Sequence, residues 1–180
     1  IHEHADADTL AASVASELQA VCDESIARRG LALLALGGGR TPLPLYRRLA
    51  RCPLPWSQVT LLPTDERCVP HDHPACNLRE IAAAFAAADG VQLQGLTPPG
   101  GEPETSEAHA RAALAQHPQP FDAVVLGMGI DGHTASLFPG VPQVPTALDP
   151  ASDIDALRID PQPLPREAPY PRVTLTAARL

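Results

Sequence analysis

The segment 124–140, VVLGMGIDGHTASLFPG, places an acid, an imidazole and two hydroxyl groups in a glycine-rich loop directly after an apolar run. His133 can act as a general base on water, and Asp131, two positions earlier, can fix the tautomer and orientation of its imidazole. Ser136 is an alternative, as a nucleophile, but the sequence HTAS lacks the GxSxG elbow. We therefore favour His133 acting on water.

A second loop, GGGRTP at 37–42, has the composition of an anion-binding turn. Its glycines allow backbone amides to approach a ligand closely. Thr41 as an N-cap, with Pro42 at the first helical position, would place those amides at a helix N-terminus, where an anion is favoured. The loop is neither GxGxxG nor a lysine-containing Walker P-loop, so we predict no nucleotide site. The alternative is a tight strand-to-helix turn without a ligand.

A third polar segment, TDERCVPHDHPACNLR at 64–79, also follows an apolar run. Its polar residues come directly after the expected strand or open the next helix: Asp65, Glu66, Arg67, Asn77 and Arg79. A surface cluster of salt bridges is the alternative interpretation. A zinc site would use Cys68, His71, His73 and Cys76, but their short spacings and the prolines fit no familiar motif, so we predict no metal.

The apolar pattern predicts that helices and strands alternate along the chain. Helical spacing begins at Leu10, with Asp8 as N-cap and Gly30 as the stop. Further helices are expected at 42–51, 77–89 and 105–117. Strands are expected at 31–36, 59–63, 121–127, 155–160 and 171–176, and a proline-rich stretch at 139–171 surrounds the fourth of these.

This alternation predicts an α/β fold, a three-layer αβα sandwich with a mostly parallel, Rossmann-like sheet. The run LALLAL at 31–36 is continuously apolar, as in a parallel strand covered on both faces. In open parallel sheets, ligands bind beyond the carboxyl ends of the strands. Each of the three polar loops follows an expected strand, so all three should lie at that edge.

Length and composition fit a single domain over residues 1–180. Hydrophobic residues make up 44% and charged residues 19%, which argues against an intrinsically disordered chain. The formal net charge is −8, and all thirteen basic residues are arginine, which argues against nucleic acid or an anionic membrane as the main partner. A small anionic ligand is compatible, because a few converging arginines can hold a phosphate.

The cysteine pattern indicates a reducing compartment. The four cysteines form neither a CxxC motif nor a regular disulfide framework. No apolar run reaches the roughly 18 residues of a membrane span, and the acidic start IHEHADADTL is unlike a signal peptide. We therefore expect a cytoplasmic protein.

Together the three loops resemble the 6-phosphogluconolactonase family. LALGGGRTP resembles its phosphate loop, DERCVP followed by DHPACNLR its second signature, and LGMGIDGHTASLFPG its most diagnostic segment. PRVTLT resembles the strand that follows the family's proline-rich excursion. The resemblance implies a glucosamine-6-phosphate-deaminase-like fold. It also implies hydrolysis of 6-phospho-D-glucono-1,5-lactone to 6-phospho-D-gluconate in the oxidative pentose phosphate pathway, without a metal or organic cofactor.

The resemblance also implies residue roles. His133 is the general base and Asp131 its orienting partner, while Arg67 either steadies the developing oxyanion or holds the phosphate. The substrate and its phosphate would be bound by Gly38, Gly39, Arg40, Thr41, Asp65, Asn77, Arg79, Gly127, Gly129 and Arg172. The partner would be this small molecule alone, with the protein a monomer or a weak homo-oligomer.

The chain departs from the family pattern at several places. Arg40 stands where the family often has a small hydroxyl residue, and Cys76 where serine is common. The family continues for several dozen residues beyond RVTLT, including a lysine near the phosphate, so we expect further natural sequence after Leu180. The first natural residues are also expected to precede Ile1, because there is no initiator methionine.

Two rival functions share this fold. The glucosamine-6-phosphate deaminase/isomerase family resembles this chain in the acidic pair Asp65-Glu66. That family has the segment GHIAFNEP, which contains an acidic residue, whereas the corresponding segment here, GHTASLFP at 132–139, contains none. Isomerisation needs such a group to move protons. A non-catalytic sugar-phosphate sensor would carry a helix-turn-helix before the domain, and the sequence shows none.

Overall fold

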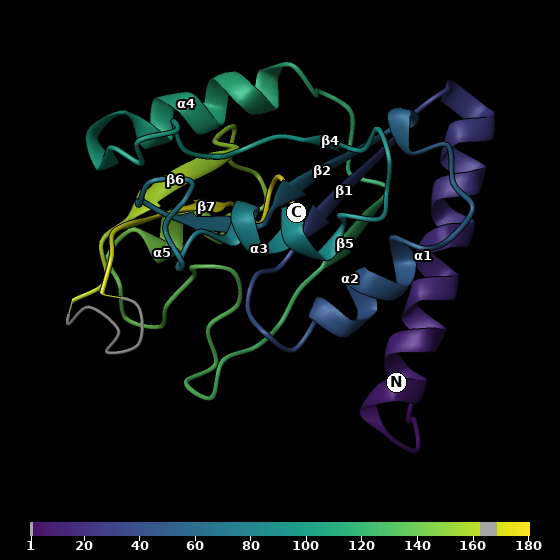
Figure 1. Ribbon diagram of the computed structural model, residues 1–180. Helices are drawn as coiled ribbons and strands as arrows, with labels where there is room; N and C mark the ends of the chain where they lie inside the picture. The colour runs from purple at the N-terminus through teal and green to yellow at the C-terminus, as the bar shows by residue number, and fades with distance from the viewer. Residues whose placement is uncertain (1, 163–168) are drawn as a thin grey trace.

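The computed structural model describes residues 2–162 and 169–180, and its centre is a parallel four-stranded sheet (Figure 1). The strand order is β4-β2-β1-β5, with the bounds β1 Ala32–Leu36, β2 Val59–Pro63, β4 Gln92–Leu93 and β5 Ala123–Val125. In the middle, Leu36 at the end of β1 pairs with Pro63 on one side and with Val125 on the other. The carboxyl ends of the three strands are therefore level, and the loops that follow them start at one edge.

Helices cover both faces of this sheet, which explains the continuous apolar run of β1. Leu34 and Leu36 pack toward the helices α1 Ala7–Arg29, α2 Leu43–Leu49 and α3 Asn77–Ala84. Leu33 and Ala35 point to the other face, where they pack with the helix α4 Pro103–Ala115 and with the end of the chain. The alternating side chains of a strand serve both layers, and the predicted α/β sandwich class is confirmed.

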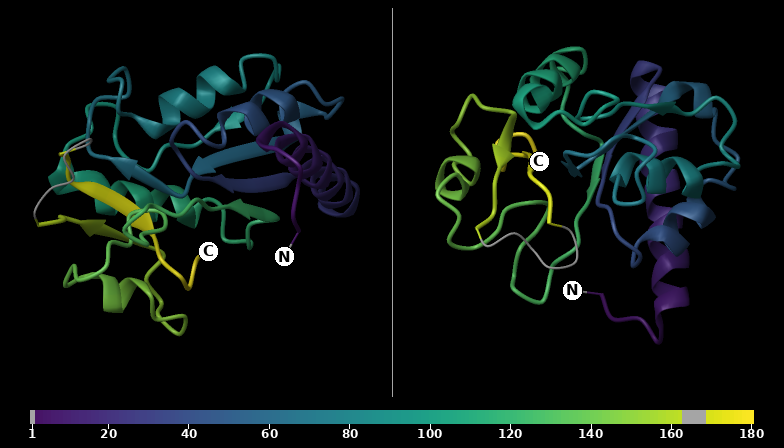
Figure 2. Two further views of the ribbon diagram at one scale, coloured as in Figure 1. Left: turned by 90° about the horizontal axis from the view of Figure 1, so that it is seen from below. Right: turned by 60° about the vertical axis from the view of Figure 1, so that its left-hand side comes forward.

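A second, antiparallel sheet lies on the opposite side of the molecule from α1 (Figure 2). Its order is β3-β7-β6, with β3 Asp65–Arg67, β6 Ala156–Ile159 and β7 Arg172–Leu175. The strands β6 and β7 correspond to strands that the sequence predicts. The prediction of a loop at the position of β3 is wrong. Its three charged residues form a strand because their backbone pairs with β7, from Asp65 opposite Thr174 to Arg67 opposite Arg172.

The remaining elements are short. The 3-10 turn Trp56–Gln58 leads into β2, and the helix α5 Val144–Ala147 lies in the proline-rich stretch. Part of that stretch, 163–168, lies outside the described residues. None of the described helices is long and apolar enough to cross a membrane.

Several predicted boundaries need correction. Asp6 rather than Asp8 caps α1, because its carboxylate accepts the Thr9 N–H at 2.7 Å, while Gly30 ends the helix as predicted. Thr41 is not the N-cap of α2. Pro42 takes that position, since its carbonyl accepts the first helical bond from the Tyr46 N–H, and no side chain caps the helix.

Two elements are also shorter than predicted. Helix α3 ends at Ala84, well before residue 89, because the backbone of Phe85 leaves helical geometry. Strand β5 is limited to Ala123–Val125 since its partner β1 ends at Leu36, opposite Val125.

A buried carboxylate joins three elements at the amino edge of the sheet. Asp122, directly before β5, accepts the Leu33 N–H of β1 at 2.7 Å and the Ser25 hydroxyl of α1 at 2.6 Å. It also pairs with Arg29 in the last turn of α1. This cluster fixes α1 against the sheet at the edge opposite the three loops.

Replacing Asp122 with asparagine should lower the free energy of unfolding by about 2 kcal/mol, because hydrogen bonds to a buried charged group are lost. Urea denaturation measures the change. Asp23, which is exposed on the surface of α1, provides the control, since Asp23→Asn should change stability by no more than about 0.5 kcal/mol. Equal losses in both variants would contradict this role of Asp122.

Candidate active site

The three polar loops meet around one cavity of about 780 Å³ at the carboxyl edge of β1, β2 and β5. All predicted site residues line it except Arg40, Arg79 and Asp131. Its lining includes polar residues and the glycines of the 37–42 loop, with Asp65, Arg67 and His133 among the polar side chains. Residues of α1 also line the cavity, including the apolar Leu10 and Val14. The topology thus brings together residues more than 90 positions apart in the sequence.

His133 and Asp131 form the predicted pair. Nδ1 of His133 lies 2.5 Å from Oδ1 of Asp131, and the hydrogen bond from His133 lowers the pKa of this exposed carboxyl. With Asp131 ionised, Nδ1 carries the proton that it donates, so Nε2 of a neutral imidazole keeps its lone pair. The pair presents an oriented imidazole at the cavity.

Gly129 makes this arrangement possible. A Cβ at this position would lie 2.4 Å from Nδ1 and Cε1 of His133, and 2.6 Å from Oδ1 of Asp131, so any side chain would displace the ring. The loop closes on itself, because the Gly129 N–H donates to the His133 carbonyl at 2.8 Å and Gly132 donates back to Gly129 at 3.0 Å. Phe138 stacks on the imidazole with ring centroids 4.4 Å apart.

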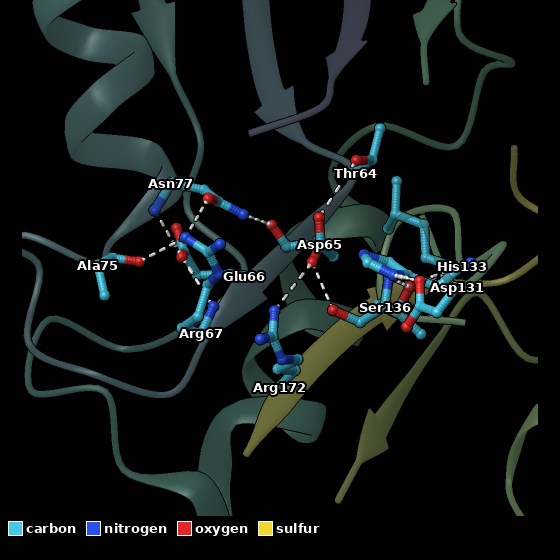
Figure 3. A network of polar contacts seen from close by, with 12 residues as sticks. Thr64, Asp65, Glu66, Arg67, Ala75, Asn77, Asp131, His133, Ser136 and Arg172 are labelled. Atoms are coloured by element: carbon cyan, nitrogen blue, oxygen red, sulfur yellow. Dashed lines mark hydrogen bonds and ion pairs between the residues drawn. The ribbon is translucent and has the colours of Figure 1, made fainter. Parts of the chain in front are cut away.

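Asp65 connects the His133 loop to the second sheet, and Figure 3 shows it between the residues around Arg67 and those around His133. The carboxylate accepts the hydroxyl of Ser136, and its Oδ2 lies 4.0 Å from Nη1 of Arg172. Ser136 is fully buried. This burial and the hydrogen bond to Asp65 favour a structural role for Ser136 over the nucleophile alternative.

Arg172 comes from β7 and was predicted from the family resemblance. It is 4% exposed, and burial lowers its pKa. Its guanidinium carbon lies 5.1 Å from the ring centroid of Phe138, the residue that stacks on His133. The second sheet therefore places a cation close to the predicted base.

Arg67 and Asn77 form a second polar group at the cavity. Nη1 of Arg67 donates to the Ala75 carbonyl at 2.9 Å and to Oδ1 of Asn77 at 2.8 Å, and Asn77 donates to the Asp65 carbonyl at 2.7 Å. A Cβ on Gly38 would lie 2.1 Å from Oδ1 of Asn77. The glycine loop therefore packs directly against the group that orients Arg67.

Arg40 and Arg79 are exposed and do not line the cavity. Arg79 follows Asn77 by two residues, and because successive helical residues are rotated by about 100°, it points away when Asn77 faces inward. Arg40 belongs to the glycine loop but is itself exposed.

Three of the four residues considered for zinc have separate partners. His71 contacts the carbonyl of Thr97 at 3.0 Å, His73 packs against Tyr170, and Cys76 donates to Glu66. Among the residues that the structure describes, no three His, Cys, Asp or Glu side chains are grouped as ligands.

Three supporting residues were not predicted: Tyr46, Glu66 in its observed role, and Phe138. The Tyr46 hydroxyl donates to the Gly37 carbonyl at 2.7 Å and so fixes the start of the glycine loop. A buried aromatic residue in a helix gives no sequence signal that separates this role from core packing. For Glu66 the only signal was its position between Asp65 and Arg67.

The fold and the site define a class of protein, an α/β enzyme whose site at the carboxyl edge of a parallel sheet combines an oriented imidazole with arginines suited to an anion. Residues 5–180 match the family described as glucosamine-6-phosphate isomerases/6-phosphogluconolactonase. The chain belongs to this family, so the predicted resemblance is confirmed.

Named relatives agree with this assignment. A 6-phosphogluconolactonase of Pseudomonas putida is 38% identical over 182 residues, which cover 100% of this chain and 73% of the relative. One from Rhizobium meliloti strain 1021 is 38% identical over 183 residues, covering 100% and 77%. The crystal structure of a 6-phosphogluconolactonase from Shewanella baltica OS155 has a TM-score of 0.86 and 32% identity, over 97% of this chain and 74% of that one.

Gly129→Ala should break the contact between His133 and Asp131, because the added methyl group takes the space of the ring. The neutral imidazole should then lose its strong preference for the proton on Nδ1. Nitrogen-15 NMR of the histidine ring measures this preference. Gly127→Ala is the matched comparison, since a Cβ there meets no atom within 4 Å and should change the tautomer less. An unchanged tautomer in Gly129→Ala would contradict the described geometry.

Proposed function

We propose that the chain hydrolyses 6-phospho-D-glucono-1,5-lactone to 6-phospho-D-gluconate. The relatives described above carry the name 6-phosphogluconolactonase, and the cavity contains the groups that this reaction requires. The observation that carries the proposal is the 2.5 Å contact between Asp131 and Nδ1 of His133, because it leaves Nε2 as a base toward the substrate.

A lactone is an activated ester, so water assisted by a neutral imidazole is a sufficient nucleophile. As the water oxygen bonds to the lactone carbonyl carbon, Nε2 of His133 takes one proton. The tetrahedral intermediate then breaks its bond to the ring oxygen, and the imidazolium returns that proton to the leaving oxygen. The carboxylic acid formed releases a proton to solvent at neutral pH. Asp131 stabilises the imidazolium between these two steps.

Among the described residues, the two arginines that line the cavity, Arg67 and Arg172, suit different parts of the substrate. The guanidinium of Arg67 donates a hydrogen bond to Asn77, and Asn77 packs against Gly38. The guanidinium therefore lies on the side of the cavity formed by the glycine loop. We assign Arg67, Gly38, Gly39 and Thr41 to the phosphate. Arg172 contacts Phe138, which stacks on His133, so its positive charge suits the oxyanion that develops on the carbonyl oxygen.

The remaining predicted residues have supporting roles in this proposal. Asp65 and Asn77 orient the two arginines, and Gly127 and Gly129 shape the loop of His133. Substrate binding in this scheme does not depend on Arg40 or Arg79, which are exposed outside the cavity.

We propose that the chain acts in the oxidative pentose phosphate pathway, in the cytoplasm, with a small phosphosugar as its only required partner. The net charge of −8 supports a small ligand over nucleic acid. We propose that it acts as a monomer or weak homo-oligomer without a metal or organic cofactor.

The direct test generates the lactone from glucose 6-phosphate with glucose-6-phosphate dehydrogenase and follows the formation of 6-phosphogluconate. The protein should accelerate hydrolysis well above the spontaneous rate. Release of ammonia from glucosamine 6-phosphate is measured in parallel and should not occur. Deamination without lactone hydrolysis would overturn the proposal in favour of the isomerase branch, and binding of phosphosugars without either reaction would favour a sensor.

His133→Ala should lower kcat by about 100-fold or more and change KM much less, because the base acts only in the chemical step. His109→Ala on α4 provides a matched control, since it removes an imidazole remote from the cavity and should leave both constants unchanged. A His133→Ala enzyme with wild-type kcat would exclude His133 as the base.

A further inference from the structure

Glu66 is a buried acid that the proposed reaction does not use. It lies in β3 between two residues that line the cavity, Asp65 and Arg67, but its own side chain extends to the start of α3. The residue is only 1% exposed. Burying a carboxylate is unfavourable unless hydrogen-bond donors surround it, so its contacts account for its presence there.

Four donors converge on this carboxylate. Oε1 accepts the Arg67 N–H at 2.8 Å and the Asn77 N–H at 2.7 Å. Oε2 accepts the Leu78 N–H at 2.7 Å and the Cys76 thiol at 3.4 Å. Burial raises the pKa of Glu66 to about 7, although the backbone donors act in the opposite direction, and burial raises the pKa of Cys76 to about 11. At neutral pH the thiol therefore keeps its proton as a donor.

These contacts form a helix cap supplied by another element. Cys76 occupies the N-cap position of α3, and its side chain makes no capping hydrogen bond. A local Ser or Asp could satisfy the first N–H groups of α3 without connecting it to anything else. The cap from Glu66 instead fixes the beginning of α3 to the backbone of β3.

The position of α3 affects the cavity through Asn77, the first residue of this helix. Its side chain bonds Nη1 of Arg67 at 2.8 Å and the Asp65 carbonyl at 2.7 Å, and it packs against Gly38. A small shift of α3 relative to β3 would break these contacts together. Arg67 and the glycine loop would then lose their common support.

We infer that Glu66 is a positioning residue for phosphosugar binding: by capping α3 from β3, its carboxylate holds Arg67, Asn77 and Gly38 in the arrangement that receives the phosphate. This inference rests on the proposed function, since it concerns the same cavity. Glu66 acts through these residues and does not contact the ligand.

The test compares two variants that each convert a buried carboxylate to an amide, Glu66→Gln and Asp122→Asn. Glu66→Gln replaces one acceptor oxygen with an amino group that faces two of the four donors. Asp122 caps no helix whose residues line the cavity, and it lies at the edge of the sheet opposite the cavity. Calorimetry measures the Kd of the product, 6-phosphogluconate, and steady-state kinetics measure kcat and KM for the lactone.

Glu66→Gln should raise the product Kd and the lactone KM by about tenfold, with kcat changed less than about threefold. Asp122→Asn should leave all three values within about twofold of wild type, although it lowers stability. Glu66→Met, which keeps the length of the side chain and removes both acceptors, should raise the Kd further. Melting temperatures show that each variant is folded during the assay.

Two outcomes would overturn the inference. If Glu66→Gln binds the product as tightly as wild type, or loses no more affinity than Asp122→Asn, Glu66 contributes stability alone. If kcat falls while Kd and KM stay constant, Glu66 supports the chemical step and not phosphate binding. Failure of the proposed function is distinguishable, because in that case the wild-type chain itself neither hydrolyses the lactone nor binds 6-phosphogluconate.

Discussion

The pairing of β1 between β2 and β5 is the constraint on which the site depends. Leu36 lies opposite both Pro63 and Val125, so three strands end level and their loops start together. The pairing itself follows from burial, since a strand with apolar side chains on both faces is stable only in the middle of a covered sheet. A shift of β5 by one residue would exchange its two faces and move the His133 loop away from the glycine loop.

Because the three strands end at the same level, the loops that follow them lie close together. Buried polar contacts then set the positions of these loops relative to one another. Asp65 binds Ser136 of the His133 loop and lies beside Arg172 of the second sheet, and Asn77 connects Arg67 to Gly38. Each of these groups is costly to bury without a partner. The network is therefore favourable only when all the elements are in place, which makes the geometry of the site a property of the whole fold.

The sequence predicted the parts that depend on local pattern. Continuous apolar runs identified β1 and β2, and the spacing of Asp131 and His133 suggested their hydrogen bond. It did not predict β3, because three charged residues resemble a loop until β7, more than a hundred positions later, pairs with them. The capping role of Glu66 and the exposed position of Arg79 also depend on where α3 packs, and tertiary contacts decide that.

A crystal structure of the protein with 6-phosphogluconate would test whether the three loops form one phosphosugar site with His133 as its base. We expect the phosphate to lie against the 37–42 loop and Arg67, with the C1 carboxylate within hydrogen-bond distance of Nε2 of His133. A phosphate bound elsewhere, or a carboxylate far from His133 while the phosphate occupies the glycine loop, would contradict this expectation.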